Sequence, residues 1–181
     1  MAQGEDREHR GHPALGAYLI HLCLERSGAM KEYRTGKKDT VLPYNWALGP
    51  TWTRFFDGLK EEKILGTRCR NCLKVLVPAR SFCPGCYEDM QDWVEVGQEG
   101  IVETWCLVNY RYTGQVKEPP YIIAQIRLDG TDCGFTHLIG GLDLTRPDEV
   151  RSRVRRGARV RAVWSQEKHG DIHDIAHFEP L

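Results

Sequence analysis

The sequence predicts a mainly β protein in which a short helix and a four-cysteine ribbon precede a small Greek-key barrel or sandwich. Three observations lead to this fold class. Two CxxC pairs stand ten residues apart in the chain. Five or six short runs of alternating apolar residues follow them, separated by turns that contain Gly or Pro. An aromatic run with helical periodicity precedes them.

Composition and charge limit the class of protein. The chain has 181 residues, 41% hydrophobic and 28% charged, which suffices for an ordinary domain with a real core. Its formal net charge is zero, which weighs against a nucleic-acid binder, since such proteins usually carry a basic excess. No run of about 18 apolar residues occurs, so no helix is expected to span a membrane. The apolar stretch 14–24 contains His21 and lacks a following cleavage site, so a signal peptide is not expected.

Cysteine usage indicates a reducing compartment. The chain has seven cysteines, of which four form the CxxC pairs and three stand alone: Cys23, Cys106 and Cys133. An odd count together with CxxC pairs is typical of a metal site and not of a disulfide scaffold. We therefore expect a cytoplasmic protein.

Residues 1–44 are predicted to be an N-terminal extension outside the core fold. Residues 1–12 are polar and expected to be disordered. A helix is then favoured from Pro13 to Gly28 by a stripe of apolar residues, namely Leu15, Tyr18, Leu19 and Leu22. A natural start at Met30 is a further hypothesis, and the intact mass of the natively expressed protein would test it.

Residues 45–68 are predicted to form a helix and a lead-in strand. Thr51 is a favoured N-cap residue. The apolar face that follows it has a 3.6-residue period and consists of Trp52, Phe55, Phe56 and Leu59. Residues 63–68 are then expected to be a strand that leads into the first cysteine pair.

Residues 69–92 are predicted to be the metal ribbon and residues 93–181 the barrel. Strands are expected over 93–96, 101–110, 121–128, 135–139, 158–164 and 172–178, with a short helix or turn over 147–155. Gly97 and Gly100 are expected to bracket a turn. Alternate residues from Val102 to Val108, including Thr104 and Cys106, are expected on one face of the second of these strands.

The two CxxC pairs predict one closed metal site. Its ligands are Cys69, Cys72, Cys83 and Cys86. Two intervening residues let both thiolates of a pair converge on one ion, and four thiolates complete a tetrahedral shell. Zinc is the expected metal, with rubredoxin-type iron as the alternative because thiolate sites accept both. Such a site keeps no open position, so the metal is expected to stabilise the fold and not to act on a substrate.

The ribbon sequence predicts two local details. Gly85 is expected to adopt positive φ, which would leave backbone N–H groups free to point at sulfur. Leu76 and Val77 are expected to pack under the ribbon.

The remaining reactive side chains are more simply explained by structure than by chemistry. His169, His173 and His177 recur every four residues, but on a strand or tail they would lie too far apart to chelate one ion. Cys106 and Cys133 are expected to lie in strands and pack in the core, and no neighbouring base is evident for either. His137 is expected to be partly exposed and structural. No catalytic residue is therefore predicted.

Arginines form the main basic feature of the chain. They are Arg151, Arg153, Arg155, Arg156, Arg159 and Arg161. A nucleic acid or a phosphate-bearing cofactor could use them, whereas a solvated strand face is the simpler explanation. Tyr110, Arg111 and Tyr112 are a second group that could contact a ligand or partner.

The order of these motifs resembles a known family, over about residues 45–180. An aromatic helix leads to the CxxC–CPxC ribbon, and the β segments GIVET (100–104), PYIIA (120–124), HLIG (137–140) and GARV (157–160) follow. This order is similar to that of small proteins in which a rubredoxin-like zinc ribbon is fused to a five-stranded OB-fold, the acyl-CoA-associated partners of thiolase-like enzymes.

The resemblance implies a function in a complex. It implies a thiolase-fold partner that carries the catalytic residues, while this chain braces the partner and helps to bind coenzyme A or acyl-CoA. The implied reaction is CoA-dependent thiolytic cleavage of a 3-oxoacyl-CoA; known contexts include archaeal acetoacetyl-CoA thiolase, steroid side-chain aldolases and the benzoylsuccinyl-CoA thiolase of anaerobic toluene degradation. The four ribbon cysteines of the family correspond to Cys69, Cys72, Cys83 and Cys86.

Two rival hypotheses come from other classes. One is a zinc-ribbon OB protein that binds single-stranded nucleic acid, which the zero net charge disfavours. The other is a stand-alone enzyme that uses Cys106 or Cys133, which would require activity of the isolated chain. No membrane partner is expected.

Overall fold

A computed structural model of the chain describes residues 44–112, 115 and 117–181. The predicted extension, including the helix expected from Pro13 to Gly28, lies outside the described residues except for Tyr44. Internal contacts divide the chain at Asn45, and the fold below belongs to the unit Trp46–Leu181. Among the described residues, no helix is both long and apolar enough to cross a membrane.

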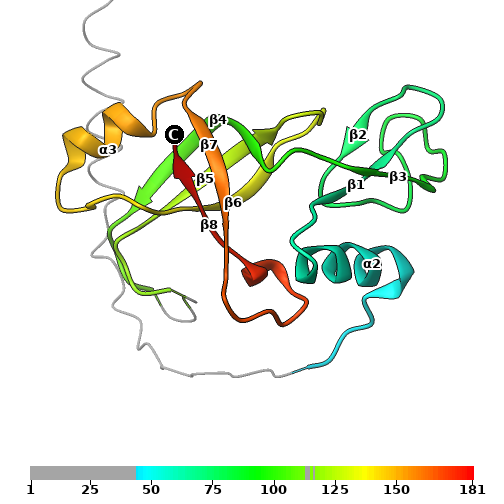
Figure 1. Cartoon of the computed structure of the whole chain (residues 1–181), viewed down its shortest axis with the longest axis horizontal. Helices are drawn as coiled ribbons and strands as arrows, with labels where there is room; N and C mark the ends of the chain where they lie inside the picture. Colours follow the sequence, from blue (N-terminus) through cyan, green and yellow to red (C-terminus); the bar gives the residue numbers. More distant parts are fainter. Residues whose placement is uncertain (1–43, 113–114, 116) are drawn as a thin grey trace, which may run out of the picture. The chain divides into compact units, whose positions relative to one another are not determined.

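The first part of this unit is a helix followed by a three-stranded antiparallel sheet (Figure 1). Helix α2 spans Gly49–Lys60, and the sheet has the order β2-β1-β3. Its strands are β1 (Leu65–Arg68), β2 (Val75–Leu76) and β3 (Asp92–Glu95). The helix begins two residues before Thr51, so the expected N-cap is wrong: Pro50 lies in the first turn, where its missing N–H leaves no hydrogen bond unmade.

The second part is a closed five-stranded barrel, which confirms the predicted mainly β fold (Figure 1). The strand order around it is β4-β5-β6-β8-β7, and all pairs are antiparallel except β6 with β8. The strands are β4 (Glu99–Val108), β5 (Tyr121–Leu128), β6 (Phe135–Ile139), β7 (Arg159–Trp164) and β8 (Ile175–Pro180). Helix α3 (Pro147–Arg153) and a 3-10 turn, η1 (Ile172–Asp174), connect the last strands.

A β-bulge in β4 changes which residues face the core. The register of β4 against β5 shifts between Val102 and Thr104, so Glu103 is the extra residue. Beyond the bulge, Trp105 packs against the core while Cys106 is exposed. The prediction that alternate residues from Val102 to Val108 share one face is therefore wrong, because one extra residue reverses the alternation.

Gly100 lies inside β4 and not at the edge of a turn as predicted. It is paired with Leu128 on one side and with Val160 on the other. A Cβ atom here would lie 2.5 Å from the carbonyl oxygen of Arg127. Glycine therefore permits the close approach of strands at the point where the barrel closes.

The helix and the barrel share one hydrophobic core. Phe55 and Leu59 of α2 are fully buried in the same cluster as Ile122 and Phe178 of the barrel. Beyond the helix, the Glu62 carbonyl accepts a hydrogen bond of 2.7 Å from the Gln98 side chain. The segment that leads into the ribbon is thus attached to the barrel by packing and not only by the chain between them.

Candidate metal centre

Two hairpin-like knuckles carry the cysteine pairs, and their backbones are held in the same way. In the first, the Cys69 N–H donates to the Lys74 carbonyl and the Leu73 N–H donates to the Cys69 carbonyl, both over 2.9 Å. In the second, the Cys83 N–H donates to the Glu88 carbonyl and the Tyr87 N–H donates to the Cys83 carbonyl, both over 2.8 Å. Each CxxC therefore forms one turn with a fixed shape, as the spacing predicted.

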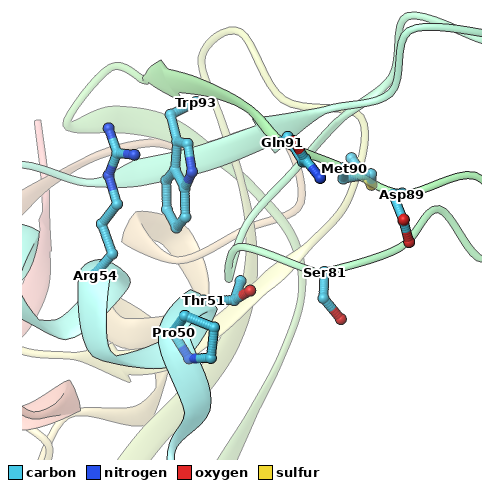
Figure 2. A pocket seen from close by; sticks show the side chains of 8 residues that line it. All are labelled: Pro50, Thr51, Arg54, Ser81, Asp89, Met90, Gln91 and Trp93. Atoms are coloured by element: carbon cyan, nitrogen blue, oxygen red, sulfur yellow. The ribbon is translucent and has the colours of Figure 1, made fainter.

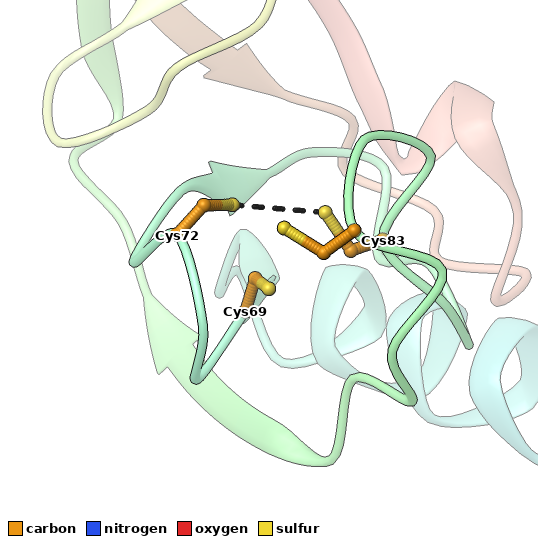
Figure 3. A group of neighbouring side chains, drawn as sticks. Cys69, Cys72 and Cys83 are labelled. Atoms are coloured by element: carbon orange, nitrogen blue, oxygen red, sulfur yellow. Dashed lines mark hydrogen bonds between the residues drawn. The ribbon is translucent and has the colours of Figure 1, made fainter.

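The knuckles bring four sulfur atoms together (Figure 3). The Sγ atoms of Cys69, Cys72, Cys83 and Cys86 all lie within 4.8 Å of one another. The Cys72 and Cys83 sulfurs are 3.7 Å apart. A tetrahedral zinc ion with Zn–S bonds of about 2.3 Å needs sulfurs about 3.8 Å apart, so the donor set and its spacing fit zinc.

The thiols differ in their readiness to ionise. The backbone N–H of Gly85, with a smaller contribution from that of Cys86, lowers the pKa of Cys83 to about 7. The pKa of Cys86 is raised to about 12, first because its side chain is hydrogen-bonded with that of Cys72 and then because it is desolvated. Four clustered thiols cannot all ionise without a cation, and a bound divalent ion would supply the charge that deprotonates them.

Positive φ occurs after each pair and not within it. Leu73 has a φ of 62° and Tyr87 a φ of 59°, and each follows the second cysteine of its knuckle. Gly85 does not have positive φ, so that prediction is wrong. The N–H groups that face sulfur come instead from the ordinary turn between Cys83 and Cys86.

The ribbon has a small core of its own around the sulfurs. Leu76 and Met90 are buried together with Cys69 and Cys83. Leu76 thus packs under the ribbon as predicted, whereas Val77 points into the larger core shared with the barrel. Successive side chains at the end of β2 thus point in opposite directions, Leu76 toward the sulfurs and Val77 toward the barrel core.

The hairpin between β5 and β6 attaches the barrel to the ribbon. Two hydrogen bonds of 2.9 Å join Asp132 to Val75. The Val75 N–H donates to the Asp132 carboxylate, and the Asp132 N–H donates to the Val75 carbonyl. The Cys133 sulfur lies 3.1 Å from the Val77 N–H and 3.2 Å from the Val77 carbonyl. Cys133 therefore lies in this connection and not in a strand as predicted, and its role here is structural.

Cys106 lies on the outer face of β4 and is exposed, so its predicted core role is wrong. The bulge at Glu103 is the cause. No hydrogen bond joins its sulfur to a histidine or carboxylate in the part of the chain that the structure describes. The arrangement of an activated nucleophile is thus not formed there.

His137 is buried and not partly exposed as predicted. Its ring packs against those of Phe135 and Phe178, with centroid distances of 5.7 and 5.6 Å. Its Nε2 is 3.2 Å from the Ile172 carbonyl, while its Nδ1 is buried without a partner among the described residues. Burial is the largest cause that lowers the pKa of His137.

The three C-terminal histidines do not form a metal site within the described ranges, where the four cysteines are the one cluster of converging ligands. His169 precedes η1, His173 lies within it, and His177 packs on Gly140, where a Cβ would lie 2.4 Å from the ring. Burial is also the first cause that lowers the pKa of His177.

Half of the arginine group is neutralised by carboxylates. Arg159 contacts Asp129 and Glu99 at 2.8 and 2.6 Å. Arg161 contacts Glu179 at 2.5 Å, and a longer pair joins Arg151 to Asp148. The pairs along β7 reduce the positive potential that a nucleic-acid phosphate would meet.

A pocket that the sequence did not predict lies between α2 and the ribbon (Figure 2). It has a volume of about 510 Å³. Figure 2 shows the Arg54 side chain alongside the Trp93 ring, and its guanidinium carbon is 4.4 Å from the ring centroid. The other lining residues are Pro50, Thr51, Ser81, Asp89, Met90 and Gln91.

The four-thiolate ribbon and the closed barrel together define a class of protein, in which a rubredoxin-like zinc ribbon is joined to an OB-fold. Two family models match accordingly: the rubredoxin-like zinc ribbon domain of ChsH2 over residues 56–91, and the C-terminal OB-fold domain of ChsH2 over residues 93–165.

The chain belongs to the DUF35 family. It is 33% identical over 123 residues to a DUF35 domain-containing scaffold protein of Methanocaldococcus jannaschii, a match that covers 65% of this chain and 82% of the relative.

Two solved structures share the fold. A DUF35 protein of unknown function from Sulfolobus solfataricus has a TM-score of 0.51 at 21% identity, over 92% of this chain and 96% of that one. The Ltp2–ChsH2(DUF35) aldolase matches with a TM-score of 0.55 at 20% identity, over 75% of this chain and 98% of the other.

Proposed function

We propose that the chain is a non-catalytic subunit of a thiolase-type acyl-CoA complex. The observation that carries this proposal is the closed four-thiolate centre, whose ligands all come from the ribbon and whose ribbon is fixed to the barrel. Such a centre has no open position for a substrate. One relative of the chain is named a scaffold protein, and a chain of similar fold belongs to the Ltp2–ChsH2(DUF35) aldolase, which supports a role beside an enzyme.

In this proposal the metal, zinc, stabilises the surface that the chain offers to its partner. Cys69, Cys72, Cys83 and Cys86 would hold it, and bound zinc supplies the positive charge that keeps the four thiolates ionised. Leu76 and Met90 pack against the two buried ligands, Cys69 and Cys83. Because the site requires reduced thiols, we place the complex in a reducing compartment such as the cytoplasm.

The proposed reaction belongs to the partner. In thiolysis of a 3-oxoacyl-CoA, the bond between C2 and C3 breaks, the acyl group passes to the sulfur of a second CoA, and a proton passes to C2. Benzoylsuccinyl-CoA is the specific substrate that we propose for assay. Because the similar ChsH2 structure is that of an aldolase, the assay should also include retro-aldol cleavage of a 3-hydroxyacyl-CoA.

We further propose that the chain helps to bind coenzyme A beside α2. The guanidinium of Arg54 is positioned on Trp93, and the hydroxyl-bearing residues Thr51 and Ser81 line the same pocket. Guanidinium and hydroxyl groups are suitable partners for phosphate. Asp89 lines the pocket as well and would oppose an anion placed next to it.

The test is isolation of the full-length chain, tagged at its chromosomal locus, from its source organism. We expect one thiolase-fold protein to co-purify in fixed ratio, with about one zinc per chain. The isolated complex should cleave the acyl-CoA, and activity should fall when this chain is omitted from the reconstituted complex. A partner that is fully stable and active alone, or the absence of any thiolase-fold partner, would contradict the proposal.

A zinc-ribbon OB protein for single-stranded nucleic acid is the competing hypothesis. The net charge of zero and the carboxylate pairs of Arg159 and Arg161 support it poorly. Fluorescence anisotropy of labelled single-stranded DNA and RNA, at two salt concentrations, distinguishes the two. Salt-dependent binding at micromolar protein would favour the nucleic-acid hypothesis.

A further inference from the structure

Two bulky side chains occupy left-handed backbone at equivalent positions of the ribbon. Leu73 and Tyr87 each follow the second cysteine of a knuckle, with φ values of 62° and 59°. Their N–H groups make matching bonds to the carbonyls of Cys69 and Cys83. The knuckle geometry imposes this backbone shape, which glycine adopts freely and residues with a Cβ adopt at an energetic cost.

Neither side chain is buried within the described fold. Leu73 is 67% exposed and Tyr87 is 83% exposed. Phe82, directly before the second pair, is 51% exposed. The chain therefore places large apolar groups where backbone geometry favours glycine and where they gain little internal packing. The knuckle accounts for the backbone shape, so what requires an explanation is the choice of a large, exposed apolar side chain at a position where glycine would fit without strain.

Charge in the ribbon points to a protein as the occupant. Within residues 69–92 the basic residues Arg70, Lys74 and Arg80 equal in number the acidic residues Glu88, Asp89 and Asp92. Arg70 is bound to Asp92 by two hydrogen bonds of 2.6 and 2.9 Å. A zinc ion held by four thiolates adds about two negative charges to this balance, so a nucleic acid or an anionic membrane would gain nothing from the ribbon surface. Leucine and aromatic side chains that protrude from a surface without a basic excess suit apolar pockets of a protein.

We propose that Leu73, Phe82 and Tyr87, the knuckle patch, dock the chain onto the enzyme subunit. The identity of this occupant rests on the proposed function, whereas the location of the surface rests on the ribbon alone. In the complex the apolar side chains enter pockets of the enzyme, and the metal centre, whose ligands come from both knuckles, fixes the distance between the two knuckles.

Site-specific photo-crosslinking in the source organism tests the location. The photoreactive residue p-benzoylphenylalanine replaces Leu73 or Tyr87 in the full-length chain, and replaces the equally apolar Leu181, 56% exposed, as a control. We expect crosslinks to the enzyme subunit from positions 73 and 87 and not from 181.

Each crosslinking outcome has a separate meaning. An isolated enzyme complex without crosslinks at 73 and 87 would overturn the patch and leave the proposed function intact. Crosslinks only to a second copy of this chain would overturn the patch as an enzyme surface. Crosslinks to a protein of another class would overturn both the enzyme as binding partner and the proposed function. The absence of both an isolated complex and any crosslink would overturn them as well.

Asparagine substitutions provide a second test, because asparagine tolerates left-handed backbone better than other residues with a side chain. In Leu73→Asn and Tyr87→Asn, we expect an unchanged or raised denaturation midpoint of the isolated chain and about tenfold weaker enzyme binding for each. Leu181→Asn should leave both unchanged. Wild-type affinity in both ribbon variants, or a lowered midpoint that shows the side chains to be structural, would overturn the proposal.

Discussion

The Cys133 sulfur is hydrogen-bonded to both backbone groups of Val77, over 3.1 Å to its N–H and 3.2 Å to its carbonyl oxygen. These residues belong to the barrel hairpin and to the ribbon, 56 positions apart in the chain. Because Val77 is 2% exposed, water cannot readily replace the thiol. One half-buried thiol therefore provides hydrogen-bond partners for both backbone groups of Val77 at the junction of ribbon and barrel.

Cys133→Ala should destabilise the chain by about 1–3 kcal/mol, since it leaves a buried N–H and carbonyl of Val77 without partners. Urea unfolding followed by circular dichroism measures the loss. Cys106→Ala is the matched control and should change stability by less than about 0.5 kcal/mol, because Cys106 is exposed. Equal stability of the two variants would show that Cys133 does not hold this junction.

Serine in place of any one ribbon cysteine should weaken metal binding, because a hydroxyl is a poor substitute for a thiolate ligand. Cys83→Ser should have the greatest effect on structure, since its sulfur is buried and receives the N–H groups of Gly85 and Cys86. Metal content by mass spectrometry should fall well below one zinc per chain, while Cys106→Ser keeps its metal. Full zinc occupancy in Cys83→Ser would contradict the four-ligand site.

His137 should make the fold sensitive to acid. Burial lowers its pKa in the folded chain below the ordinary value of about 6.5, so the unfolded chain takes up the proton more readily. The stability that neutral His137 contributes is complete above about pH 6.5 and is lost as the pH falls through the folded pKa.

The measurement is the urea midpoint at pH 7.5 and pH 5.5. Between pH 7.5 and pH 5.5 the urea midpoint of His137→Gln should fall less than that of the wild type, because glutamine does not titrate. His177, whose pKa is also lowered by burial, accounts for a further part. An unchanged pH dependence in His137→Gln would disprove this role.

Gly100→Ala should destabilise the barrel by about 2–4 kcal/mol, because its Cβ would lie 2.5 Å from the Arg127 carbonyl oxygen and force the strands apart. Gly85→Ala is the matched control, since a Cβ there meets nothing within 4 Å and φ is not positive. Thermal unfolding of both variants provides the comparison. A wild-type melting temperature in Gly100→Ala would contradict the close approach of β4 and β5 at this position.

The sequence predicted features that depend on short stretches of chain. The CxxC spacing placed four sulfurs in one cluster because each knuckle is a local turn, and the strand over Tyr121–Leu128 followed from its own alternation. The exposure of Cys106 could not be predicted, because the bulge at Glu103 exists only through pairing with β5. His137 alternates with Phe135 and Ile139, a pattern that could have placed it inside the barrel.

Features formed by distant segments were missed for the same reason. The pocket with Arg54 and Trp93 joins a helix to a strand beyond the ribbon. The contact of Cys133 with Val77 likewise requires the barrel hairpin to reach the ribbon. Positive φ at Leu73 and Tyr87 was missed because leucine and tyrosine do not favour it. Glycine does favour it, which led to the wrong prediction at Gly85.

Removal of the metal from the purified complex tests the central claim most directly. A chelator is added while zinc release, amide hydrogen exchange of residues 69–92 and partner binding are followed together. A structural centre predicts that zinc loss, rapid exchange in the ribbon and release of the partner occur at the same chelator concentration, while the barrel strands remain protected. A zinc-free chain that keeps a protected ribbon and a bound partner would contradict a structural role for the metal.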